Sequence, residues 1–160
     1  MKIYYLMTGI IAALGALILE VFFPLFSSNF FSLISQDPAI NLSFMIAISI
    51  EELTKGIFIW KLFSSQTSQE KKFLGAFFFA TGFSLLEITL NIFKNNSWNF
   101  FYSSFLPLLG LFLIHTFTSF IFVLFLAFQK KISPLSFFYA FLLAFSFHFL
   151  YNWTVLFLNF

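Results

Sequence analysis

Five long apolar stretches alternate with short polar segments along the chain, and each stretch is long enough to cross a lipid bilayer as a helix. About 20 apolar residues span the hydrocarbon core in helical form. The stretches cover approximately residues 3–26, 41–62, 73–93, 104–128 and 134–158. No tandem repeat or linker interrupts this pattern, which therefore predicts a single transmembrane domain over residues 1–160.

The composition supports this interpretation. Of the 160 residues, 61% are hydrophobic and only 9% are charged, which is typical of an integral membrane protein. We therefore expect an all-α fold, a polytopic bundle of about five transmembrane helices in contact with the lipid bilayer. The chain has no cysteine, so disulfides and thiolate nucleophiles are excluded. The net charge of +2 is too small to indicate a nucleic-acid partner.

The lysines predict how the bundle is oriented. If the amino terminus lies inside, six lysines fall on the cytoplasmic side and only Lys94 falls outside, as the positive-inside rule requires. The carboxy terminus then lies outside. The six inner lysines are Lys2, Lys61, Lys71, Lys72, Lys130 and Lys131.

Glu51 and Glu52 stand side by side within the second apolar stretch. A carboxylate near the bilayer centre costs about 2.5–3.5 kcal/mol on insertion scales. Two adjacent carboxylates should be selected against unless they have a role. An ionisable residue inside a span is therefore taken first as a functional-site hypothesis.

Four of the five stretches carry polar residues four positions apart, which places each pair on one helix face. Small residues lie on the same faces and mark helix–helix contact, so these faces should turn toward the bundle interior. Counted from the inner ends, the leading residues lie about 15–22 Å deep and are expected to converge. The first stretch has no such pair, and Glu20 is expected to be interfacial. The pairs are Glu51 and Lys55, Glu87 and Asn91, His115 and Ser119, and His148 and Asn152.

Two kinds of hydrolytic chemistry fit these residue types. In the first, Glu51 or Glu52 takes a proton from water and later gives it to the leaving amine of a peptide bond. Glu87 and His115 would then assist, with Lys55 and Ser119 in supporting roles. His148 and Asn152 would polarise the scissile carbonyl.

In the second, a divalent metal such as zinc is held by Glu87, His115 and His148, with Glu51 or Glu52 as the base. The choice between the two glutamates stays open, as does the choice between metal and no metal. A non-catalytic membrane scaffold or immunity-type binding protein is an alternative. A small proton-coupled carrier is disfavoured, because the chain has no visible inverted repeat.

The same residues form four short motifs that resemble those of the PrsW-type intramembrane proteases. EELTK resembles the EExxK motif of that family, FSLLE its FxxxE element, and HTFTS and HFLYN its later histidine elements. All four occur in the family's order, each on its own stretch. They occupy residues 51–55, 83–87, 115–119 and 148–152.

The resemblance implies a polytopic membrane endopeptidase, glutamic-type or metal-dependent, that cleaves a membrane-anchored protein or peptide. Some members of the family act on regulators such as anti-sigma factors. In such families the second-motif glutamate and the histidines surround a water activated by a glutamate. A bacterial cytoplasmic membrane is the implied location. The CAAX-prenyl protease and bacteriocin-processing superfamily is similar in its glutamate pair and histidine motifs.

Overall fold

The computed structural model describes residues 2–31, 42–64, 68–94, 105–128 and 133–157, and this part of the chain is almost entirely helical. The expected all-α architecture is confirmed, with one helix on each of the five apolar stretches. Ser133 caps the start of the last helix, because its hydroxyl accepts a hydrogen bond from the Ser136 amide at 3.2 Å. The helices are α1 (Lys2–Phe31), α2 (Leu42–Phe63), α3 (Gln69–Lys94), α5 (Phe105–Phe128) and α6 (Pro134–Phe157).

Four of these helices are long and apolar enough to cross a membrane by length and composition. The fifth, α2, has 22 residues, but the ionisable residues Glu51, Glu52 and Lys55 lie close together near its middle, which sets it apart from the other four helices. The candidate spans are Lys2–Phe23, Gln69–Phe93, Phe105–Ala127 and Pro134–Phe157. Together the helices form a polytopic membrane bundle. The division of residues 1–160 as one domain stays a prediction.

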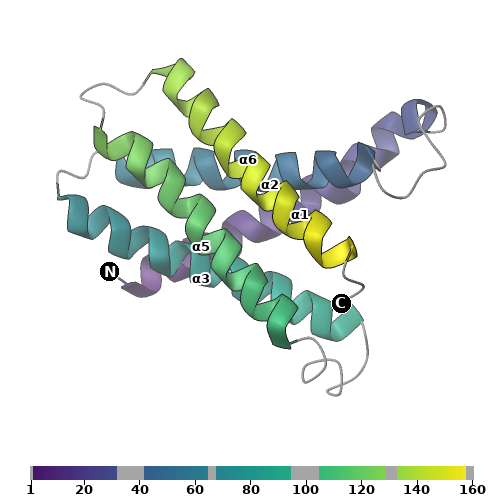
Figure 1. Ribbon diagram of the computed structural model, residues 1–160, viewed down its shortest axis with the longest axis horizontal. Coiled ribbons are helices and arrows are strands. Elements are labelled where there is room, and N and C mark those ends of the chain that lie inside the picture. The colour runs from purple at the N-terminus through teal and green to yellow at the C-terminus, as the bar shows by residue number, and fades with distance from the viewer. Residues whose placement is uncertain (1, 32–41, 65–67, 95–104, 129–132, 158–160) are drawn as a thin grey trace.

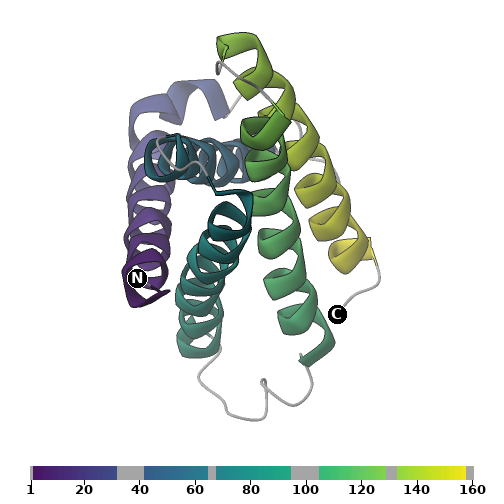
Figure 2. The ribbon, with the colours of Figure 1, turned by 90° about the vertical axis from the view of Figure 1, so that its left-hand side faces the viewer.

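Successive helices run in alternating directions, so the starts of α1, α3 and α6 lie toward the left of Figure 1 with the ends of α2 and α5. In Figure 2, α2 is seen almost along its axis and lies between α1 and α5. Helix α2 packs against α1, α5 and α6, while α3 packs against α1 and α5. The residues of α2 therefore lie where the other helices meet.

The outer surface of the bundle is strongly apolar. Large side chains such as Ile3, Leu106 and Phe157 are 71%, 67% and 76% exposed. A protein in water would not leave so much contiguous apolar surface uncovered, whereas lipid tails solvate it well. The exposed apolar surface therefore supports the integral membrane location.

The interior shows the opposite pattern. Seven polar or ionisable side chains from four helices are completely shielded: Glu52, Lys55, Ser84, His115, Thr118, Ser119 and His148. Buried charges are retained only where they are paired and hydrogen-bonded. Their partners define the candidate site.

Candidate functional site

Lys55 lies at the centre of the polar interior, and three acceptors surround its ammonium. Its Nζ atom donates to Oε1 of Glu52 at 2.5 Å and lies 2.8 Å from Nδ1 of His115. The hydroxyl of Thr118 accepts a third hydrogen bond at 3.0 Å. The ring of Phe83 covers a further side, with its centroid 5.2 Å from Nζ. All three ammonium protons therefore have partners, which offsets the cost of burying the charge.

His115 joins this lysine to the third helix. Its Nε2 atom lies 2.5 Å from Oε2 of Glu87 on α3. An ammonium can only donate hydrogen bonds, so Nδ1 of His115 must accept the one from Lys55. The ring proton then lies on Nε2 and is donated to Glu87. Both nitrogens of His115 are engaged in this arrangement.

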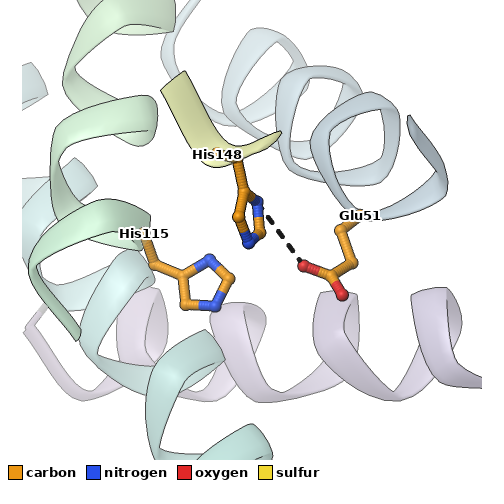
Figure 3. Close-up of side chains that lie close together, drawn as sticks. All are labelled: Glu51, His115 and His148. Carbon is orange, nitrogen blue, oxygen red and sulfur yellow. Dashed lines mark ion pairs between the residues drawn. The ribbon is translucent and has the colours of Figure 1, made fainter. Parts of the chain in front are cut away.

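His148 approaches the glutamate pair from α6. Its Nδ1 atom lies 2.6 Å from Oε1 of Glu52 and 3.7 Å from Oε2 of Glu51. Figure 3 shows the imidazole directed at the Glu51 carboxylate. Because Glu52 accepts a hydrogen bond from the N–H at Nδ1, a neutral His148 carries its lone pair on Nε2. That nitrogen is buried and has no hydrogen-bond partner among the described residues.

The side chains of Glu51, His115 and His148 form a compact group in the described part of the chain (Figure 3). One potential ligand atom from each lies within 4.8 Å of the others. Oε2 of Glu51, like Nε2 of His148, is buried without a hydrogen-bond partner in the described region. Two imidazoles and a carboxylate are a donor set that suits zinc.

The expected metal set differs from this group in one residue. The sequence hypothesis used Glu87 with the two histidines, whereas the structure groups Glu51 with them and places Glu87 on Nε2 of His115. A carboxylate in that position orients an imidazole ligand. Oε2 of Glu51 and Nε2 of His148 have no hydrogen-bond partner among the described residues, whereas both nitrogens of His115 are already bonded, to Lys55 and to Glu87. The three residues therefore fit a divalent metal if His115 gives up one of these two hydrogen bonds.

A cavity of about 50 Å³ lies beside Glu51, between α1, α2 and α3. Glu20, Glu51 and Glu87 contribute its polar wall. This volume has room for water. Glu20 was expected at the interface, but it lines this cavity together with the two site glutamates. The signal in the sequence was a single carboxylate in an otherwise apolar helix. The apolar part of the wall comes from Ala13, Ala16, Leu17, Phe83, Leu86 and Leu90.

Other expected residues lie around the cluster without contacting it as closely. Ser119 is fully buried, and its hydroxyl has no hydrogen-bond partner among the described residues. Asn152 is half-buried one helical turn beyond His148. The sequence hypothesis did not include Thr118, although its spacing of three residues from His115 places both on one face. Asn91, the partner of Glu87 in the α3 pair, is also half-buried.

Comparison with known proteins gives one match. The family model described as PrsW family intramembrane metalloprotease covers residues 1–160, the whole chain. No curated protein and no solved structure matches the chain. A membrane endopeptidase is consistent with the buried glutamates and histidines, and its substrate is a membrane-embedded protein or peptide. The chain belongs to the PrsW family of intramembrane metalloproteases.

Proposed function

We propose that the chain hydrolyses a peptide bond of a membrane-associated protein or peptide with a water molecule activated at Glu51. One observation carries the choice of this glutamate. Each of the two glutamates has a buried carboxylate oxygen without a hydrogen-bond partner among the described residues, but only Glu51 lines the cavity between α1, α2 and α3. Glu52 is fully buried and binds Lys55 and His148 through one oxygen. Glu51 is therefore the reacting carboxylate, and Glu52 holds its neighbours in position.

The proton path follows from these contacts. Glu51 takes a proton from water, whose oxygen attacks the carbonyl carbon, and the proton then passes to the nitrogen of the leaving amine as the C–N bond breaks. Nε2 of His148 presents a lone pair, so it accepts a hydrogen bond from water rather than polarising the carbonyl. Asn152, whose amide can donate, keeps the carbonyl role that the sequence indicates.

The metal chemistry implied by the family description can be assigned to the same residues. Glu51, His115 and His148 would hold a divalent ion such as zinc, and Glu52 and Glu87 would orient the two imidazoles. When bound, such an ion polarises a carbonyl and makes water nucleophilic at neutral pH. Glu51 is then a ligand rather than the base. Its removal abolishes activity in either arrangement.

The family match does not favour the scaffold or the carrier alternative. The similarity to the CAAX-prenyl protease superfamily remains a prediction from the glutamate pair and the histidine motifs. We further propose that the substrate segment reaches Glu51 through the cavity, because this is the side on which the carboxylate meets open space.

The test is cleavage of a membrane-anchored peptide library by the purified full chain in lipid nanodiscs. Glu51→Gln should lower the cleavage rate by about 10²- to 10⁴-fold, the usual contribution of a general base. Glu70→Gln is the control, because Glu70 is an exposed carboxylate in the first turn of α3. Cleavage by Glu51→Gln at the unmodified rate would refute the proposal. Metal analysis of the active protein, with chelation and re-addition of zinc, separates the two roles of Glu51.

A further inference from the structure

Thr118 is a buried polar residue on α5 that the proposed mechanism does not use. Its hydroxyl lies 3.3 Å from the carbonyl oxygen of His115, to which it donates, and 3.0 Å from Nζ of Lys55. A hydroxyl has one proton, and the bond to the helix carbonyl uses it. Only lone pairs then face Lys55, so Thr118 acts as a fixed acceptor for the ammonium.

This acceptor completes a set of three. The ammonium of Lys55 has three protons, and its partners are Glu52, His115 and Thr118 at 2.5, 2.8 and 3.0 Å. The direction of each bond is determined because an ammonium cannot accept. Nδ1 of His115 therefore accepts a hydrogen bond from Lys55, and the ring carries its own proton on Nε2, toward Glu87. Loss of one acceptor leaves an N–H in a dry interior without a partner, and the ammonium must then shift.

We propose that Thr118 is a positioning residue of the site: it holds the Lys55 ammonium against Nδ1 of His115 and so keeps the His115 proton on Nε2. Phe83 supports the same arrangement, since its ring lies 5.2 Å from Nζ and 5.0 Å from the His115 ring, between centroids. Only the kinetic consequence of this inference rests on the proposed function. The position of the proton can be measured on the resting protein.

The position of the His115 proton can be tested by nitrogen NMR of the full chain labelled with ¹⁵N-histidine, in nanodiscs and without added metal. The chain contains two histidines, so few signals overlap. In the unmodified protein, Nδ1 of His115 should show the shift of an unprotonated nitrogen and Nε2 that of a protonated one. Thr118→Val, which removes the hydroxyl at nearly constant volume, should move both shifts toward a mixture of tautomers. Thr118→Ser should restore them.

Thr116→Val is the matched control. Thr116 lies on the same helix and donates to the carbonyl of Phe112 at 2.9 Å, one turn back on its own helix. Thr116→Val should leave both His115 nitrogen chemical shifts unchanged. In the cleavage assay, Thr118→Val should lower kcat by about tenfold with KM unchanged, which is typical of losing an outer contact of a site, and Thr118→Ser should recover it.

Three results would overturn the inference. The first is a His115 proton found on Nδ1 in the unmodified protein. The second is a Thr118→Val variant whose His115 nitrogen chemical shifts are unchanged. The third is an equal change of these shifts in Thr116→Val or Thr118→Ser, since the effect would then arise from packing. An absence of peptide cleavage would count against the proposed function, while the NMR result would still decide the position of the proton.

Discussion

At the scale of single residues, the polar interior depends on the ion pair between Glu52 and Lys55. Both side chains are fully shielded, and their contact at 2.5 Å joins residues three positions apart on α2. Burying two charges is costly, and their attraction repays the cost only when the remaining lone pairs and protons find partners. His148 contacts Oε1 of Glu52, and His115 and Thr118 accept the other two protons of the ammonium. Oε2 of Glu52 has no hydrogen-bond partner among the described residues. The pair is therefore much more sensitive to losing one member than to losing both.

Lys55→Met should destabilise the fold by about 3–5 kcal/mol, because it leaves a buried carboxylate without its counter-charge. The double variant Glu52→Gln with Lys55→Met should recover most of this loss, since no uncompensated charge remains. The measurement is the free energy of unfolding in mixed micelles with increasing denaturing detergent. Lys61→Met is the control, as Lys61 is exposed in the last turn of α2. Equal losses in the single and double variants would contradict the pairing.

The sequence predicted which side chains turn inward but not which partners they meet. Spacing along a helix places Glu51, His115 and His148 on interior faces, because the period of the helix is fixed. Which atom faces which depends on the rotation and tilt of each helix, and spacing does not determine these. Glu87 illustrates the limit: its helix face was predicted, yet its contact with Nε2 of His115 required the packing of α3 against α5.

At the scale of helices, α1 and α3 pack closely because small residues let their backbones approach. A side chain added at Gly9 would meet the backbone carbonyl of Phe79, and one added at Gly82 would meet that of Leu6. Ala12, Ala13 and Ala16 of α1 are buried in the same region. The neighbour against which α1 packs could not be predicted from the spacing of its residues alone.

Gly82→Ala should destabilise the bundle by about 1–3 kcal/mol, because the added methyl group meets backbone that cannot move without separating α1 from α3. Gly15→Ala is the matched change, since a side chain added at Gly15 meets nothing within 4 Å. There the better helix propensity of alanine should raise stability by up to about 1 kcal/mol. Thermal unfolding of both variants in the same detergent measures the difference. Equal effects at the two glycines would exclude a close α1–α3 approach.

Access to Glu51 also belongs to the scale of helices, because the cavity lies between three of them. Ala16 lines this cavity and is 1% exposed. Ala16→Leu should fill part of the space and lower kcat/KM by about tenfold, as a few added carbon atoms do in a tight site. Ala140→Leu is the control, since Ala140 is equally buried but lines a separate cavity between α2, α5 and α6. If both variants lose the same activity, substrate does not enter beside α1.

At the scale of the whole molecule, Lys2, Lys61, Lys71 and Lys72 lie at one end of the bundle, while Lys55 lies inside α2 and Lys94 ends α3 at the other end. Lys2 begins α1, Lys61 lies in the last turn of α2, and Lys71 lies in the first turn of α3. Figure 1 shows these three helix ends close together. Lys130 and Lys131 lie outside the described residues. The hydropathy pattern was sufficient to predict alternating helices. The common end for the lysines agrees with the positive-inside rule. We therefore propose that this end faces the cytoplasm of a bacterial cell.

This orientation can be tested with single cysteines, because the natural chain has none. Lys71→Cys places a thiol at the exposed start of α3, and Phe157→Cys places one at the exposed opposite end of α6. With the amino terminus inside, a membrane-impermeant maleimide should label Phe157→Cys in intact bacterial cells. It should label Lys71→Cys only after the membrane is opened. Both variants must first retain cleavage, which shows that the fold is intact. The reverse labelling pattern would show that the bundle has the opposite orientation, with the lysine-rich end outside.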